Sequence, residues 1–304
     1  MTKYPVYIVS KGRYDNPMTA KLFLEDLVPF KIVVEPQEYD KYCEAVGKEN
    51  VIKLPFANLG QGSYPARNFC WEHSVKNGYE RHWVFDDNIP KFRRLYKGKR
   101  IPANALKCIQ ILEEFTDRYL NIGIAGFNYV MFVTDNTRKP FVKNVHVYSS
   151  LLIKNDMPFR WRMKYNEDVD LCLQVLHNGL CTILFNALMI HKTSTTTKMK
   201  GGNQDELYLG NAYDKKVLKA RSLEEIWPQY AETKIKFNRP HHHVNWKKHF
   251  KQELIRNPLI NFDELSKVNN HSMKLRAVKD IKSPEMKKLL KEANNTEKTP
   301  RNNE

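Results

Sequence analysis

The sequence predicts an α/β fold in which a mostly parallel, Rossmann-like sheet is flanked by helices and followed by a basic C-terminal extension. Three observations support this prediction. Short apolar runs typical of buried strands alternate with stretches at helical spacing. One run, His82–Phe85, leads directly into the polar motif Asp86-Asp87-Asn88, and ligands bind at such carboxyl ends of parallel strands. The densest basic and aromatic stretch is Arg239–His249, toward the C-terminus.

The first hundred residues alternate strands with helices. Three short apolar runs are expected to be buried strands, namely Pro5–Val9, Ile32–Val34 and Val51–Leu54. A helix fits between about Thr19 and Leu27. Ser63 can cap a second helix, which has Pro65 in its first turn and stops at Asn77-Gly78.

The same rhythm continues beyond the acidic motif. Apolar residues recur at helical spacing from Ala105 to Phe115, and Ile122–Phe127 and Asn144–Ile153 are expected to be extended. Asn166 precedes another helix, which Gly179 ends. A buried strand is expected at Cys181–Ile190. It is followed by a polar loop at Lys192–Gln204, which can act as a mobile lid, and by a helix at Glu206–Lys219.

Composition restricts the class of protein. A formal charge of +16 favours a polyanionic partner, nucleic acid above all, although a solubilising surface is the simpler alternative. The five cysteines are odd in number and widely spaced, so neither a disulfide framework nor a zinc site is indicated. The N-terminus has no apolar signal core and no apolar run is long enough to span a bilayer, so we expect a cytosolic protein without a membrane partner.

Asp86, Asp87 and Asn88 are the candidate metal ligands, together with His191. Two adjacent acids and an amide at a strand end form a hard-oxygen site that suits Mg²⁺ or Mn²⁺ shared with substrate phosphates. Turn formation is the alternative explanation for the acids. His191 ends a strand and can bind the same metal, although a lone histidine is more often structural.

Two loops can hold phosphate. Ser10, Lys11 and Arg13 follow the first strand, and Lys and Arg suit a diphosphate. Gly201 and Gly202 can let backbone amides approach a phosphate, or they form a hinge. No Walker motif and no Gly-x-Gly-x-x-Gly follows the first strand, which argues against the two commonest alternative uses of such a sheet.

An acidic pair opens the helix after Asn166. Asn166-Glu167-Asp168 resembles the acidic motif that opens the acceptor-side helix of inverting GT-A glycosyltransferases. The resemblance implies that Asp168 is the general base for an acceptor hydroxyl, and that Glu167 orients this hydroxyl or the acceptor. Both acids are also explained by the favourable interaction of carboxylates with a helix N-terminus.

The basic stretch near the C-terminus is the candidate nucleic-acid site. Its cations can contact phosphates and Trp246 can stack on a base. Its three consecutive histidines can instead bind metal or lie on a surface. The candidate residues are Arg239, His241, His242, His243, Trp246, Lys247 and Lys248.

In combination, these motifs resemble those of GT-A glycosyltransferases. Gly62 to Asn68, one helix, and the strand with Asp86-Asp87-Asn88 follow the family's order of Gly, Ala-Arg-Asn and strand-Asp-x-Asp. The resemblance implies that Arg67 and Asn68 line the nucleotide pocket, and that Asp86 and Asp87 reach the ribose or the metal. Asn88 departs from the pattern, which has a second aspartate there, and so leaves the direct metal ligands open.

The whole set of motifs, from Tyr4 to Phe250, is similar to that of TET-associated glycosyltransferases of bacteriophages. This resemblance implies transfer of a sugar from a nucleotide donor, a UDP-sugar, to hydroxymethylated pyrimidines in double-stranded phage DNA, with 5-hydroxymethylcytosine the expected acceptor. It also implies the cytoplasm of an infected bacterium. The sugar, the choice between cytosine and uracil acceptors, the addition of a first or a second sugar, and the oligomeric state stay open.

These motifs suggest a division of the chain and a mechanism. Residues 1–204 form the catalytic domain, with a nucleotide-sugar half at about 1–100 and an acceptor half at about 101–204. Residues 205–282 form a basic, aromatic, helical extension, and 283–304 a disordered tail. We expect a metal-dependent, inverting transfer. The alternatives are a metal-dependent nuclease and a catalytically silent module that binds DNA.

Overall fold

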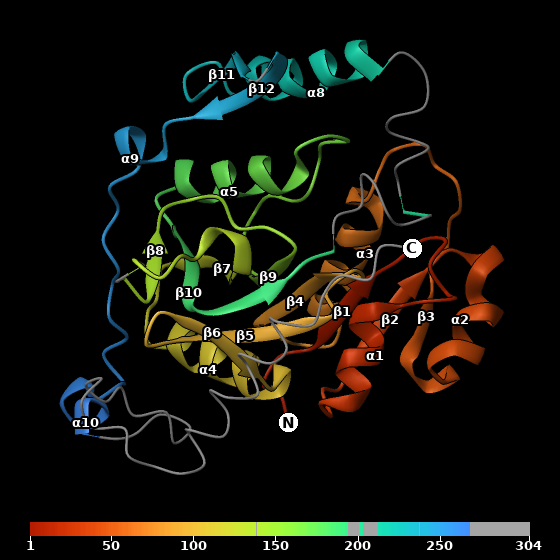
Figure 1. Cartoon of the computed structure of the whole chain (residues 1–304), viewed down its shortest axis with the longest axis horizontal. Coiled ribbons are helices and arrows are strands. Elements are labelled where there is room, and N and C mark those ends of the chain that lie inside the picture. Colours follow the sequence, from red (N-terminus) through yellow and green to blue (C-terminus); the bar gives the residue numbers. More distant parts are fainter. Residues whose placement is uncertain (138, 194–200, 203–211, 237, 268–304) are drawn as a thin grey trace.

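A central sheet of ten strands organises the molecule (Figure 1). The computed structural model describes residues 1–137, 139–193, 201–202, 212–236 and 238–267, with side chains left undescribed at 212–216. The strand order is β3-β2-β1-β4-β9-β7-β10-β5-β6, and β8 pairs with β10. The bounds are β1 Val6–Val9, β2 Lys31–Val34, β3 Val51–Lys53, β4 Arg81–Asp86, β5 Lys91–Tyr96, β6 Lys99–Ala103, β7 Ile122–Tyr129, β8 Phe141–Lys143, β9 Ser150–Lys154 and β10 Cys181–His191.

Parallel pairing brings several strand ends to one edge. β1 pairs in parallel with β2 and β4, β2 with β3, and β7 with β10, while β9 runs antiparallel between β4 and β7. Gly126 permits the close approach of β7 and β9, because a Cβ there would lie 2.1 Å from the carbonyl oxygen of Ser150. The predicted α/β class is confirmed. The expectation of a mostly parallel sheet is wrong, because β5, β6, β8 and β9 pair antiparallel with their neighbours and the sheet is mixed. The sheet edge collects the carboxyl ends of β1, β2, β3, β4, β7 and β10.

Helices cover both faces of the sheet. α1 (Met18–Glu25), α2 (Tyr39–Val46) and α4 (Ala105–Asp117) pack on one face, and α3 (Tyr64–Lys76) and α5 (Glu167–His177) on the other. Alternation along β4 sends Trp83 and Phe85 to the first core and Val84 to the second. Trp83 stacks on Phe127 with ring centroids 5.6 Å apart. Burial on both faces makes this sheet a rigid base for the residues at its edge.

The chain beyond the sheet packs on the outer side of α5. This C-terminal unit consists of α8 (Ala212–Ile226), the hairpin of β11 (Ala231–Lys236) and β12 (Arg239–Val244), and α9 (Trp246–His249). The last described helix, α10 (Phe262–Lys267), lies apart from this unit, with Phe262 against Tyr119 after α4. The unit and α5 share one apolar cluster, in which Val169 and Leu173 of α5 pack with Leu223, Trp227 and Val244 of the unit. The expected extension was helical, but its basic segment forms a strand, because β12 pairs with β11 in antiparallel register. The expected tail and most of the expected lid lie outside the described residues.

A buried histidine should make the fold sensitive to acid. His82 in β4 is fully buried, bonds Asn155 Oδ1 through Nδ1 at 2.6 Å, and has a pKa lowered by burial from 6.5 to about 4. The unfolded chain therefore takes up this proton at a higher pH than the folded chain, and stability falls as the pH drops from 6.5 toward 4. We expect a loss of roughly 2 kcal/mol at pH 5 from this residue alone.

Urea denaturation at pH 7.5 and pH 5 measures this loss, with His82→Gln as the matched variant. Gln keeps a polar partner for Asn155 and does not titrate, so its stability should fall less between the two pH values. Equal falls in the two proteins would contradict the assignment.

Candidate functional site

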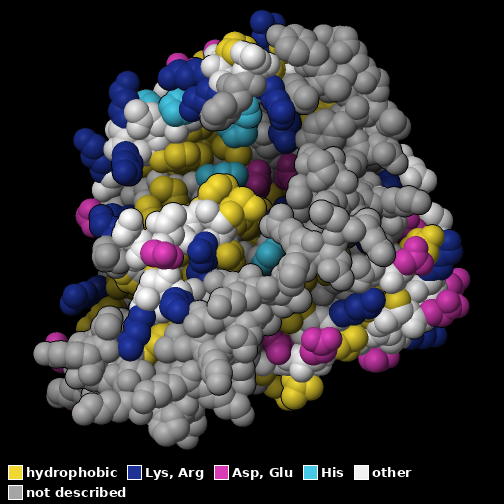
Figure 2. Space-filling model, viewed as in Figure 1, with side chains coloured by type: hydrophobic (Ala, Val, Ile, Leu, Met, Phe, Trp, Pro, Cys, Tyr) yellow, Lys and Arg dark blue, Asp and Glu magenta, His cyan; other side chains and the backbone are white. Residues whose placement is uncertain are grey.

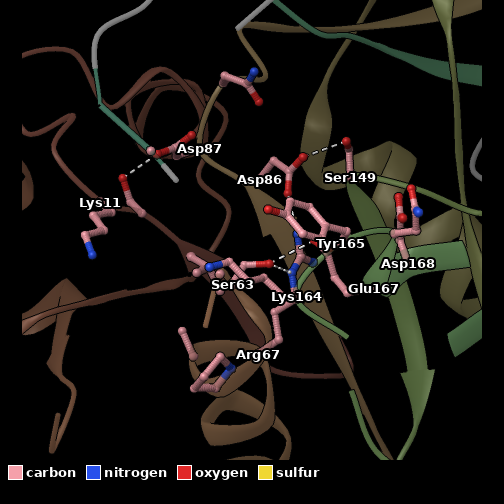
Figure 3. A pocket seen from close by; sticks show the side chains of 18 of the residues that line it. Lys11, Ser63, Arg67, Asp86, Asp87, Ser149, Lys164, Tyr165, Glu167 and Asp168 are labelled. Carbon is pink, nitrogen blue, oxygen red and sulfur yellow. Dashed lines mark hydrogen bonds and ion pairs between the residues drawn. The ribbon is translucent and has the colours of Figure 1, made fainter. Parts of the chain in front are cut away.

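A cavity of about 410 Å³ opens at the edge where the parallel strands end (Figure 3). Its floor comes from the loops after β1 and β4, and its walls from the start of α3, the end of β7, the segment before α5 and the residue after β10. α8 and β12 of the C-terminal unit contribute one lining residue each, Lys219 and His242. Among the sequence-predicted residues, the cavity brings together Ser10, Lys11, Arg13, Arg67, Asp86, Asp87, Asn88, Glu167, Asp168, Gly202 and His242.

Asp86 is the most heavily bonded acid in the cavity. Its Oδ1 accepts from Arg67 at 2.8 Å, and its Oδ2 accepts from Lys192 Nζ at 2.5 Å and Ser149 Oγ at 2.6 Å. Burial alone would raise the pKa of Asp86, but the charges of Lys192 and Arg67 outweigh it and hold that pKa well below its usual range. The carboxylate is ionised and faces two cations.

Asp87 lies deeper and binds the loop after β1. It accepts from Ser10 Oγ at 2.6 Å and forms an ion pair with Arg13. Burial raises the pKa of Asp87 although Arg13 and Ser10 oppose the shift. The same loop receives the Gly201–Gly202 segment, since Gly202 N–H donates to Lys11 O at 2.6 Å and Arg13 donates to Gly201 O at 3.2 Å. Any side chain at Gly201 would collide with the carbonyl of Gly12, which accounts for the glycine there.

Arg67 joins the two acidic motifs from the first turn of α3. Its guanidinium lies 3.8 Å from Glu167 Oε1, and Ser63 Oγ donates to that same carboxylate at 2.9 Å. The predicted side-chain cap of α3 is wrong, because Ser63 Oγ bonds the side chains of Glu167 and Arg67 and no backbone N–H of the helix. Burial lowers the pKa of Arg67, but Asp86 and the acids at the start of α5 outweigh burial and raise it. Asn68 lies away from the cavity, where its amide holds the backbone of Trp161 at 2.8 and 3.1 Å.

Asp168 lines the cavity and pairs with a histidine. Its Oδ2 lies 3.0 Å from His146 Nε2, and Trp246 stacks on His146 with ring planes 12° apart. Burial works against ionisation, yet the charge and hydrogen bond of His146 hold the pKa of Asp168 below its usual range. The adjacent Glu167 behaves oppositely, because burial and Asp168 raise its pKa. The pair thus contains one carboxylate held ionised and one pushed toward protonation.

The described residues do not offer a ready divalent-cation site. The four carboxylate oxygens of Asp86 and Asp87 are occupied by Arg, Lys and Ser donors, and no group of three His, Cys, Asp or Glu among the described residues can hold a metal. A cation at Asp86 would also meet Lys192, where like charges 4 Å apart cost about 4 kcal/mol per unit charge. A metal would therefore have to displace Lys192 first.

His191 is the predicted metal ligand that lies furthest from this arrangement. His191 ends β10 opposite Lys91 of β5. It is exposed and does not line the cavity. Burial, with Arg93 and Lys91 nearby, lowers its pKa. Side chains alternate along a strand, so the next residue, Lys192, points into the cavity where His191 does not.

A protein-family model described as TET-Associated Glycosyltransferase matches residues 4–202, which is about two thirds of the chain. The chain belongs to the TET-associated glycosyltransferase family. It is therefore a glycosyltransferase, and the whole cavity except Lys219 and His242 comes from the matched segment. The C-terminal unit lies outside that segment.

Two further comparisons accompany the family match. No curated protein matches the chain. Five solved chains match, among them a protein from Desulfovibrio desulfuricans G20 assigned as a nucleotide-diphospho-sugar transferase. That match has 12% identity and a TM-score of 0.35, and covers 61% of this chain and 80% of the other. No helix within the described ranges is long and apolar enough to cross a membrane.

The candidate nucleic-acid residues of this family member divide between the cavity and the outer surface. Figure 2 shows Lys, Arg and His side chains gathered around apolar side chains on the side of the C-terminal unit. Arg239, His241, Lys247 and Lys248 are exposed, while His243 is half-buried. His242 turns into the cavity, where burial lowers its pKa to about 4, and Trp246 covers His146. The hairpin and α9 thus carry exposed cations on the same unit that contributes His242 to the cavity and covers His146.

Sequence reasoning missed three residues that contact the candidate acids, namely Ser149, His146 and Lys192, and a fourth, Tyr129, that contacts Ser149. Tyr129 ends β7 and bonds Ser149 Oγ at 2.5 Å. Only Lys192 left a usable signal, since it is the first cation after a buried strand, next to the histidine that sequence reasoning selected.

Proposed function

We propose that this glycosyltransferase moves a sugar from a nucleotide-sugar to the hydroxyl of a hydroxymethylated pyrimidine in double-stranded DNA, with inversion at the sugar carbon. The observation that supports it most is that one cavity contains both groups of residues. The strand-end loops suited to a diphosphate line it, and so does the ionised Asp168, which lies beneath the basic C-terminal unit. A donor and an acceptor can therefore meet within one site.

The donor side of the cavity matches a nucleoside diphosphate in chemistry. Leu54, Phe56 and Leu59, after β3, provide an apolar wall on which a base can stack. Lys11 and Arg13 lie at the neighbouring strand end, where they can bind the diphosphate. Asn88 Oδ1 is buried with no hydrogen-bond partner among the described residues, and so can accept from a ribose hydroxyl. We propose uridine as the base on family resemblance alone.

The acceptor side supplies the base for a single displacement. Asp168 removes the proton of the hydroxymethyl group as its oxygen attacks the anomeric carbon, and the bond to the diphosphate breaks with its electrons on the leaving oxygen. His146 holds Asp168 in place, with Nε2 3.0 Å from Oδ2. Arg13 and Lys11 stabilise the diphosphate as it departs. The exposed cations of the hairpin and α9 hold the DNA phosphates.

The expected Mn²⁺ or Mg²⁺ has no step in this proposal. The two aspartates that would bind it are committed to Arg, Lys and Ser donors, and Asn88 offers one remaining oxygen. A divalent cation of this kind prefers about six oxygens.

A donor and acceptor panel tests the proposal. The protein is incubated with UDP- and GDP-sugars and with DNA containing either cytosine or 5-hydroxymethylcytosine, and the nucleosides are analysed by mass spectrometry. We expect a hexose or pentose mass increment on the hydroxymethylated nucleoside only, with the anomeric configuration inverted by NMR. No increment with any donor, or plasmid cleavage without a sugar nucleotide, would overturn the proposal in favour of a binding module or a nuclease.

A further inference from the structure

We propose that Lys192 supplies the positive charge that the acidic motif would otherwise draw from a divalent cation, so that donor binding and sugar transfer proceed without metal. The inference rests on the proposed use of a nucleoside diphosphate donor. It identifies Lys192 as a catalytic residue, because its ammonium lines the cavity wall beside Asp86.

The ammonium of Lys192 is held at a defined position. Nζ donates to Asp86 Oδ2 at 2.5 Å and to Ser149 Oγ at 2.6 Å, and lies 5.7 Å from the ring centroid of Tyr129. These partners come from the ends of β4 and β7 and from the residue before β9. A lysine on a flexible four-carbon stem loses most of its rotamer freedom in such a position, so the charge is already placed before a substrate arrives.

Charge pairing explains why this ammonium can serve a diphosphate. Arg67 donates to the other oxygen of Asp86 at 2.8 Å and also lies 3.8 Å from Glu167, so Asp86 shares Arg67 with Glu167 and has Lys192 as its second cation. Asp87 is likewise paired with Arg13. Lys192 therefore retains charge for a diphosphate that enters the cavity, where charge-assisted hydrogen bonds to phosphate oxygens are strong.

Asn88 gives an independent reason for the same assignment. Its side-chain Nδ2 donates to Thr193 O at 2.8 Å, and its backbone carbonyl accepts from Thr193 N–H at 3.0 Å. This double contact fixes the residue that follows Lys192. An ionised aspartate at position 88 has no N–H and cannot make the first bond. Asn88, in place of the second aspartate of Asp-x-Asp, thus removes a carboxylate that could bind a metal. Its side-chain amide also holds Thr193, the residue next to Lys192.

Nucleotide binding tests the inference without depending on transfer. UDP, GDP, ADP and the matching monophosphates are titrated calorimetrically in EDTA against wild type, Lys192→Met and the control Lys91→Met. Lys91 is exposed on β5, outside the cavity. We expect wild type and the control to bind a diphosphate in EDTA, and Lys192→Met to bind it about tenfold more weakly while its affinity for the monophosphate changes little. Equal diphosphate affinities for Lys192→Met and wild type would overturn the proposal.

Transfer and metal binding complete the test. We expect wild-type transfer to persist in EDTA, Lys192→Met to transfer about a hundredfold more slowly, and the EPR signal of free Mn²⁺ to be unchanged by wild-type protein. Loss of wild-type transfer in EDTA with recovery in Mn²⁺, or stoichiometric loss of the free Mn²⁺ signal, would overturn the role of Lys192. Transfer to no acceptor under either condition would instead count against the proposed function, and the binding titrations would still decide the role of Lys192.

Discussion

Asp168→Asn is expected to reduce the rate of sugar transfer about a thousandfold, within the range of general base catalysis. Asn keeps the size of the side chain and a polar partner for His146, but it cannot take up the proton of the acceptor hydroxyl. The wild-type carboxylate lies 3.0 Å from His146 and is held ionised by it, which is the state that a base requires. Single-turnover transfer to hydroxymethylated DNA measures the effect, and the donor dissociation constant should stay close to that of wild type.

Glu167→Gln is the matched variant for this prediction. Burial raises the pKa of Glu167, and its carboxylate is engaged by Ser63 and lies 3.8 Å from Arg67, so we assign it to positioning. Its substitution should disturb donor binding more than the rate of the chemical step. If Glu167→Gln were inactive and Asp168→Asn were active, Glu167 and not Asp168 would be the general base.

Asp170→Ala is expected to lower the free energy of unfolding by about 3 kcal/mol. Asp170 lies in α5 with no exposed surface, where it accepts from Trp227 Nε1 at 2.7 Å, Gln174 Nε2 at 2.9 Å and the guanidinium of Arg162 at 2.9 Å. The substitution leaves buried donors without an acceptor. It also removes the hydrogen bond between α5 and Trp227 of the C-terminal unit.

Urea denaturation measures this loss, and Asp156→Ala is the control. Asp156 is an exposed acid whose partner, Lys154, lies 2.7 Å away on the surface, and such pairs contribute about 0–1 kcal/mol. Hydrogen exchange should further show that β11 and β12 in Asp170→Ala open before the sheet does. If the two variants lost equal stability, Asp170 would have no role in attaching the unit.

The strands that sequence reasoning recovered and those that it missed differ in burial. β1, β4, β7 and β10 are buried on both faces and therefore appear as apolar runs. β5 contains Lys91, Arg93 and Arg94, and forms a hairpin with β6 through Lys97 and Gly98, both at positive φ. Its charged face carries no apolar run, so only pairing with β10 reveals it as part of the sheet.

The sequence by itself determined the alternating fold and the position of Asp86-Asp87-Asn88 at a strand end, since both follow from local runs of apolar and polar residues. Only the tertiary structure decided the partners of these acids. Ser149 lies 63 residues from Asp86 along the chain and Lys192 lies 106 residues away, and they meet because β9 inserts between β4 and β7 while β10 ends beside them. A contact made by strand order across a sheet leaves no periodic trace in the sequence. For that reason the motif could be located from the sequence, and the lysine that contacts it could not.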